Sequence, residues 1–481
     1  MREAHRAAWR IPERDESVAR PGIKNLAMIS ATVGISVLVG YIAATAEGVA
    51  VFTGILVACG LLAHMARLSV LEILCVLLPV SFVITIGFGL FTAFPLNVSA
   101  ADAILPLAIV SALSTRANAL VPSHAFTRAA WTYAVSLISV ATVSLLIALA
   151  TQVSPDFTYG LTAILKMAIS MGYLLTFYQL SKRSVAGGDF RFLAIWSLTA
   201  FAISGLSIVG YLLYQSGFST PFTQDYRVVG TFDDPNLFSS YLVISFCILL
   251  MSRVVDPKIW KTVAALTILA AMVLTGSRAV IPAILFGLLV AAFAARGERA
   301  ARRQLWRTVS IGLLLVAASF LVWNPIDSLE SVTRIVTSDD TISSDGRIQL
   351  WSVAWRMWQE HPVLGVGIGQ YRAVADQYIF GGVGNIAHNT YLSFLAETGL
   401  VGFVVFISLP LAIFVRVLRS KRRGNTFAPL LALGLAAVAV QAFTLNLENS
   451  RALWALLGMS VAFCDLAARS HSEQESFTRR G

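Results

Sequence analysis

Long apolar runs alternate with short polar segments along most of the chain. A membrane-spanning helix needs about 20 consecutive, mainly apolar residues. Because so many runs meet or approach that length, the pattern predicts an all-α fold, a polytopic transmembrane bundle of about 12–14 helices. The predicted helices cover residues 26–45, 48–66, 69–93, 99–114, 129–151, 159–180, 190–215, 236–253, 259–275, 278–295, 308–323, 389–417, 428–446 and 450–467.

Composition excludes an ordinary soluble domain. Of the 481 residues, 57% are hydrophobic and only 13% are charged, and the mean hydropathy is +0.74. All four cysteines fall within the apolar runs, so neither a disulfide framework nor a thiolate metal site is predicted. The first apolar run follows a polar stretch and is long enough to span, which predicts insertion by the chain's own helices rather than by a cleavable signal peptide.

Basic residues predict the orientation of the bundle, because lysine and arginine stay mainly on the cytoplasmic side. With a cytoplasmic N-terminus, most of the 36 basic residues fall inside, and the outer segments carry only Arg227, Arg278, Arg334, Arg347, Arg356, Arg372 and Arg451. The net charge of +10 therefore indicates membrane topology and contact with anionic membrane lipid, and no nucleic-acid partner is predicted.

The predicted organisation has five parts. They are a cytoplasmic tail (1–25), a transmembrane bundle of about eleven helices (26–323), a large periplasmic loop (324–388), C-terminal transmembrane helices (389–467) and a second cytoplasmic tail (468–481).

Three charged residues are predicted at similar depth inside the bundle. Lys166 lies about 10 Å from the outer end of its helix at 1.5 Å per residue, and Asp102 and Glu397 lie near the outer ends of theirs. Intramembrane charges are costly unless they are paired or hydrated. We therefore expect Lys166 to pair with Asp102 or Glu397 in an intramembrane ion cluster below an outward-facing cavity; a purely structural ion pair is the alternative.

Two short outer segments carry arginines next to helix starts. Asp234, followed by a proline, is typical of an N-cap, which leaves Arg227 without a local explanation. Arg278 is the only charge in the tight turn LTGSRAVIP, where the N–H groups of Gly276 and Ser277 could join the guanidinium in holding an anion. The alternative for Arg278 is an interfacial arginine that reaches lipid headgroups.

The large outer loop contains a predicted amphipathic helix and ends at a histidine. Arg347 begins this helix, and the residues Ile348, Trp351, Trp355 and Trp358 predict a face that lies on the membrane. The later glycines predict a backbone folded tightly over a cavity rather than a dinucleotide-binding loop. His388 stands where the polar loop meets the next apolar run, as either a catalytic group or a polar residue at a helix start.

These residues resemble the O-antigen ligase and polysaccharide polymerase superfamily of membrane glycosyltransferases. The resemblance covers residues 225–450. Its motifs are Arg227 with Gly-Thr-Phe-Asp-Asp-Pro-Asn236, Thr275-Gly-Ser-Arg278, Gly346-Arg347 with Trp351, His361-Pro-x-x-Gly-x-Gly-x-Gly369, and His388-Asn389 followed by Gly399-x-x-Gly402. By motif match, His388 corresponds to the essential histidine of the family, and Arg278 and Arg347 to its essential arginines. Arg227 is a weaker match for a residue that binds the lipid diphosphate together with Arg278 and Arg347, and Asn389, Gly399 and Gly402 are positioning residues.

The resemblance implies transfer of a glycan from an undecaprenyl-diphosphate carrier to an acceptor sugar hydroxyl at the periplasmic face of the inner membrane. The implied acceptor is a lipid A–core sugar in ligases and a lipid-linked glycan in polymerases, and a chain-length regulator stays open as a further partner. The implied fold is an all-helical membrane glycosyltransferase with short helices in a periplasmic loop. The implied chemistry is inverting, with no metal and no cofactor.

The residues fit this chemistry on independent physical grounds. Cleavage of a sugar–diphosphate bond develops negative charge on the leaving phosphate, which guanidinium groups stabilise. An imidazole with an ordinary pKa near 6.5 is suited to accept the proton of the attacking hydroxyl.

Two other classes of function are open to the sequence. A transporter or flippase of lipid-linked oligosaccharide would need polar residues along a path to both membrane faces, whereas the candidate residues here cluster on one. An assembly scaffold would leave the arginines and His388 without a role. Within the enzyme class, a surface or exopolysaccharide polymerase is slightly favoured over a ligase.

Overall fold

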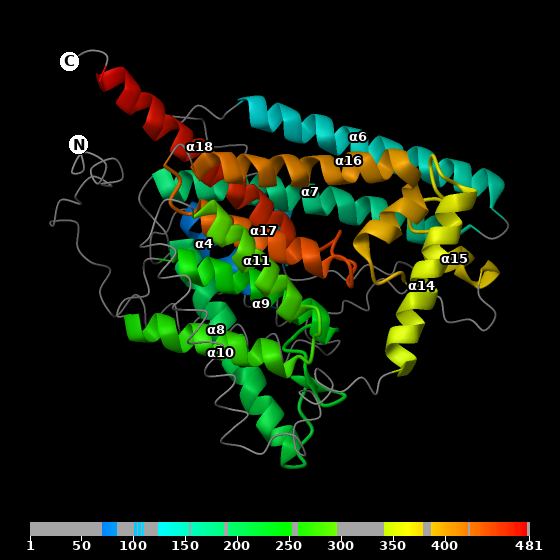
Figure 1. The fold of residues 1–481 in the computed structure, drawn as a ribbon, viewed down its shortest axis with the longest axis horizontal. Coiled ribbons are helices and arrows are strands. Elements are labelled where there is room, and N and C mark those ends of the chain that lie inside the picture. Colours follow the sequence, from blue (N-terminus) through cyan, green and yellow to red (C-terminus); the bar gives the residue numbers. More distant parts are fainter. Residues whose placement is uncertain are drawn as a thin grey trace.

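The computed structural model describes residues 70–83, 101–102, 104–106, 108–109, 124–152, 155–186, 191–252, 258–295, 341–378, 386–421 and 424–478, and these are almost entirely helical (Figure 1). The helices are α4 (Val70–Ser81), α6 (His124–Thr151), α7 (Phe157–Ala186), α8 (Arg191–Gln215), α9 (Pro235–Met251), α10 (Lys258–Leu274), α11 (Val280–Ala294), α14 (Thr341–Glu360), α15 (Tyr371–Val374), the 3-10 turn Ala375–Gln377, α16 (Thr390–Ser420), α17 (Ala428–Gln441) and α18 (Arg451–Thr478). The strands β1 (Thr223–Gln224) and β2 (Arg227–Val228) pair antiparallel. The predicted all-α fold is confirmed.

The apolar runs form the predicted helices wherever the structure describes them. Five helices, α6, α7, α8, α16 and α18, are long and apolar enough to cross a membrane, and α9, α10, α11 and α17 are shorter apolar helices. The predicted runs 26–45, 48–66 and 308–323 lie outside the described residues. Large apolar side chains such as Val135, Leu289 and Val404 are exposed on these helices, as expected where lipid covers the surface. The chain is therefore a multi-pass membrane protein.

Several helix ends differ from the prediction, and α14, for example, begins at Thr341 rather than at Arg347. Helix α17 ends at Gln441 rather than near residue 446, and the residues that follow form a turn-rich connection before α18. Helix α18 continues to Thr478, although the second polar tail was predicted to begin at residue 468. The apolar pattern locates the buried stretch, but a helix continues as long as its backbone hydrogen bonds do.

Aromatic side chains hold the centre of the bundle. Phe82, just after α4, lies between Tyr173 of α7 and Trp196 of α8, with ring centroids 5.5 and 5.1 Å away. The Trp196 indole donates a 2.9 Å hydrogen bond to Ser245 of α9, so its polar atom is satisfied inside the core. These contacts join α4, α7, α8 and α9.

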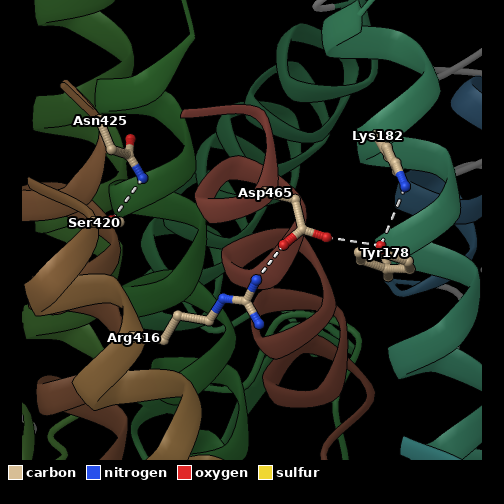
Figure 2. A network of polar contacts seen from close by, with 6 residues as sticks. All are labelled: Tyr178, Lys182, Arg416, Ser420, Asn425 and Asp465. Atoms are coloured by element: carbon tan, nitrogen blue, oxygen red, sulfur yellow. Dashed lines mark hydrogen bonds and ion pairs between the residues drawn. The ribbon is translucent and has the colours of Figure 1, made fainter. Parts of the chain in front are cut away.

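A polar network ties three helices together far from the N-terminal end of α16 (Figure 2). The Asp465 carboxylate of α18 forms an ion pair with Arg416 of α16 and accepts a 2.8 Å hydrogen bond from the Tyr178 hydroxyl of α7. Lys182, only 2% exposed, donates a 3.3 Å hydrogen bond to the same hydroxyl. One buried carboxylate therefore fixes the relative positions of α7, α16 and α18.

Replacing Asp465 by alanine is expected to destabilise the bundle by about 2 kcal/mol, because the buried hydroxyl loses its acceptor and the Arg416 cation its partner. The loss is no larger because Arg416 is partly exposed, so solvent screens its ion pair with Asp465. The measurement is the thermal melting temperature of the purified protein in detergent. Tyr178→Phe is the matched control and should cost about 1 kcal/mol. An unchanged melting temperature for Asp465→Ala would show that the network does not stabilise the fold.

Candidate functional site

The site is built around the first residues of α16. Asn389 is the N-cap, and its side-chain oxygen accepts hydrogen bonds of 3.0 Å from the backbone N–H groups of Tyr391 and Leu392. His388, which precedes the cap, is half-buried and has a φ of +48°. This left-handed conformation is uncommon for a residue other than glycine and costs about 1–3 kcal/mol. The local fold must therefore hold His388 in place.

Gly399 breaks α16 into two arms. Its φ of +64° and ψ of −167° are not helical, and the orange ribbon changes direction near α15 (Figure 1). A side chain could not fit there, because a Cβ on Gly399 would lie 2.3 Å from the carbonyl carbon of Val363. The freed N–H of Leu400 instead donates to the Pro362 carbonyl at 2.9 Å. The break thus docks the segment that follows α14 onto α16.

The glycine-rich segment 361–369 packs along the first arm of α16, close to the break at Gly399. The N–H of Val366 donates to the Ala396 carbonyl at 2.8 Å, and a Cβ on Gly365 would lie 2.4 Å from the carbonyl carbon of Glu397. The predicted tight backbone is present, and it packs on the first arm of α16. Gly402, in the second arm, faces Thr398, whose Oγ1 a Cβ there would approach to 2.2 Å.

Helix α14 brings Arg347 toward this arm. Its buried face consists of Leu350, Val353, Ala354 and Met357, which pack with Val366, Tyr371 and Ala387. Ile348 and Trp355 of the predicted membrane-binding face are 61% and 45% exposed. The predicted helix is therefore present, but it has a second apolar face that buries it against the protein, and the tryptophan spacing alone did not indicate this face.

Arg278 lies in the predicted tight turn between α10 and α11. The N–H of Gly276 donates to the Val273 carbonyl at 2.9 Å, and the N–H of Ser277 donates to the Thr275 hydroxyl at 3.3 Å. The prediction that these N–H groups could hold an anion is wrong, because closure of the turn uses both. The exposed Arg278 guanidinium is the group that this turn offers to a ligand.

Arg227, in β2, donates a hydrogen bond to the turn that carries Arg278. Its Nε donates to the Thr275 carbonyl at 2.7 Å, and its Nη2 donates to the Asn236 side-chain oxygen at 3.0 Å. The predicted cap is confirmed, since Asp234 accepts from the N–H of Asn236 at 2.6 Å and has Pro235 after it. In this conformation Arg227 joins the α9 start to the Arg278 turn, and a role in binding diphosphate stays a prediction.

Electrostatic interactions connect the candidate residues from four separate elements. Arg347 interacts with Asp234 and Arg278, and His388 interacts with Arg347 and Asp234. Burial lowers the pKa of His388 from its ordinary 6.5, the Arg347 cation lowers it further, and Asp234 opposes both effects. The imidazole is therefore neutral at pH 7. Arg347 is thus within electrostatic range of both Arg278 and His388, and the catalytic roles of all three stay predictions.

Lys166 interacts electrostatically with Asp102, as expected, but the hydrogen bonds of the Asp102 carboxylate come from other residues. Asp102 accepts hydrogen bonds from Arg451 Nε at 2.9 Å and from the Tyr173 hydroxyl at 2.8 Å. Lys166 is attracted most strongly by Glu448, is repelled by Arg451, and is attracted more weakly by Asp102. The direct partner of Asp102 is thus Arg451, which the sequence identified only as an outer basic residue.

Glu397 belongs to another group of contacts. Its carboxylate accepts a 3.1 Å hydrogen bond from the Tyr371 N–H and another from the N–H of Gly369. It therefore anchors the glycine-rich segment to α16. The sequence predicted that Glu397 lies at a similar depth in the membrane to Lys166. Depth does not give the position of a helix around the bundle, so it could not show that Glu448 would be the glutamate that interacts with Lys166.

The geometry defines a multi-pass membrane protein with a cationic site that contains one neutral imidazole. Within the described part of the chain, no group of three His, Cys, Asp or Glu side chains could hold a metal ion.

Residues 263–407 match the family model of the O-antigen ligase. The resemblance to the O-antigen ligase and polymerase superfamily is confirmed there. The matched region includes Arg278, Arg347, His388 and Asn389, whereas Arg227 precedes it. The family implies an enzyme of the glycosyltransferase type. A comparison with curated proteins finds no match.

Proposed function

We propose that this protein transfers a glycan from an undecaprenyl-diphosphate carrier to an acceptor sugar hydroxyl at the periplasmic face of the inner membrane, with both termini cytoplasmic. The observation that carries the proposal is that Arg347 interacts electrostatically with both Arg278 and His388. A polymerase of surface or exopolysaccharide is slightly favoured over a ligase that acts on a lipid A–core acceptor. The family match supports the reaction class.

In the proposed step, neutral His388 accepts the proton of the acceptor hydroxyl as its oxygen attacks the anomeric carbon of the donor. The bond between that carbon and the diphosphate breaks, and the electron pair leaves with undecaprenyl diphosphate. Arg278 and Arg347 stabilise the charge on the leaving phosphate, the role that a divalent metal would otherwise take. A single displacement inverts the anomeric centre, and His388 later releases its proton to water.

The test is transfer by the purified protein in detergent with a lipid-diphosphate glycan, an acceptor glycan and a metal chelator. The proposal expects a longer glycan and free lipid diphosphate, with an inverted linkage. A protein that moves the lipid-linked glycan across vesicles without changing it covalently would be a flippase and would contradict the proposal. A deletion strain separates the two acceptors, since loss of secreted polysaccharide indicates a polymerase and loss of the O-chain from lipopolysaccharide indicates a ligase.

The pH dependence should report the charge of Asp234. His388 acts while neutral, so kcat/KM falls as the pH drops through the pKa of His388, which lies below 6.5. Asp234 raises this pKa, so Asp234→Asn should move the acidic limb to lower pH while asparagine keeps the N-cap. The measurement is kcat/KM against pH.

Asp233→Asn is the matched control, because it removes the same charge one residue earlier and Asp233 is not among the groups that shift the pKa of His388. An equal shift in both variants would mean that the limb reports overall charge rather than the contact between Asp234 and His388.

A further inference from the structure

The connection between α17 and α18 encloses the start of α16. The N–H of Thr390 donates to the carbonyls of Ala442 at 2.9 Å and Leu445 at 3.0 Å. The Thr390 hydroxyl donates to the Leu445 carbonyl at 2.7 Å and accepts from the Leu447 N–H at 2.8 Å. The residues directly after His388 are therefore bound to a segment more than fifty positions later in the chain.

Asn446, in this connection, contacts the peptide group that joins His388 to Asn389. Its Oδ1 accepts a 3.0 Å hydrogen bond from the N–H of Asn389, the group that closes the peptide bond of His388. Its Nδ2 lies 3.3 Å from both the Ser393 hydroxyl and Glu448 Oε1. Loss of the Asn446 amide would free a backbone donor beside a residue in the left-handed region.

Glu448 supports Asn446 from behind. Its carboxylate accepts a hydrogen bond from Asn446, and it attracts the Lys166 ammonium of α7. Burial raises the pKa of Glu448, and these contacts oppose that shift. The Trp454 indole also donates to the Glu448 carbonyl at 2.7 Å. Hydrogen bonds therefore run from Glu448 through Asn446 to the peptide of His388, and Lys166 supplies an opposite charge to Glu448.

We propose that Asn446 and Glu448, with Lys166 as the counter-charge, are positioning residues that hold His388 in its left-handed conformation at the site. The inference rests on the proposed glycan transfer. A strained conformation persists only where the surrounding structure over-determines it, and the hydrogen bonds to Asn389 and Thr390 supply that constraint. The network keeps the imidazole where the acceptor hydroxyl needs it, without touching the substrate.

The experiment compares Asn446→Leu with the double exchange Asn446→Asp, Glu448→Gln. Leucine has similar size but cannot accept from the Asn389 N–H, so kcat should fall by roughly 10²-fold with little change in KM, as for a small misplacement of a catalytic group. The double exchange keeps an acceptor at 446 for the Asn389 N–H, reverses the direction of the hydrogen bond between 446 and 448, and keeps the total charge of the pair. It should restore most of kcat. Unchanged kcat for Asn446→Leu, or no recovery in the double exchange, overturns the proposal.

A second readout keeps the inference separate from the function. The rate at which diethyl pyrocarbonate modifies His388, measured by mass spectrometry, should rise severalfold in Asn446→Leu and return in the double exchange. If the wild-type protein transfers no glycan but the modification rates change in this way, the proposed function fails and the positioning stands. If Asn446→Leu does not fold, Lys166→Met replaces it, and unchanged kcat and modification rate in that variant count against the network.

Discussion

Replacing His388 by alanine is expected to lower the rate of glycan transfer by about 10²–10⁴-fold, the range typical of a lost general base. The imidazole is neutral at pH 7, half-buried and beside the Arg347 cation, so nothing else in its position can take the proton of an acceptor hydroxyl in the same geometry. The measurement is the initial rate with purified variants in detergent, together with the melting temperature as a check on folding.

Two controls separate the imidazole from its backbone. His388→Asn keeps a residue that tolerates a positive φ but removes the base, so it should be as inactive as alanine. His361→Ala changes a second histidine, which lies in the turn after α14, and should leave most of the activity. Near-normal transfer by His388→Asn would show that His388 is not the base.

The apolar pattern was enough to predict the helices, because helix formation by an apolar run in a membrane depends on the run itself. A run of about 20 apolar residues can bury its backbone polar groups in lipid only as a helix, whatever surrounds it. The cap at Asp234 followed for a similar reason, since the Asp-Pro pair satisfies local N–H groups. The position of His388 before α16 could also be predicted from the sequence, because it lies at the boundary between a polar and an apolar segment.

Contacts between distant segments could not be predicted in the same way. The pairing of Asp102 with Arg451 joins residues almost 350 positions apart, and the sequence gives their depth but not their angle around the bundle. Similarly, the buried face of α14 exists only because the 366–375 segment and α16 pack against it. The constraint on His388 comes from the α17–α18 connection, which no local motif marks.

Replacing Arg347 by glutamine is expected to lower kcat/KM by about 10²–10³-fold, because one charged donor to the leaving phosphate is lost. The variant should also change the pH profile. The Arg347 cation lowers the pKa of His388, so its removal raises that pKa and moves the acidic limb of the profile to higher pH. The measurement is kcat/KM across pH 5–8, the range in which histidine titrates.

Lysine at position 347 separates the two effects of the arginine. It keeps the positive charge, so the acidic limb should stay at its wild-type position, but it cannot offer the two parallel donors that a guanidinium gives to a phosphate, so the rate should stay low. Arg356→Gln, an exposed arginine on the same helix, is the matched control and should change neither quantity. If lysine restores full activity, charge alone stabilises the leaving group. If glutamine leaves the acidic limb in place, Arg347 does not act on His388, and the coupling that supports the proposed function is absent.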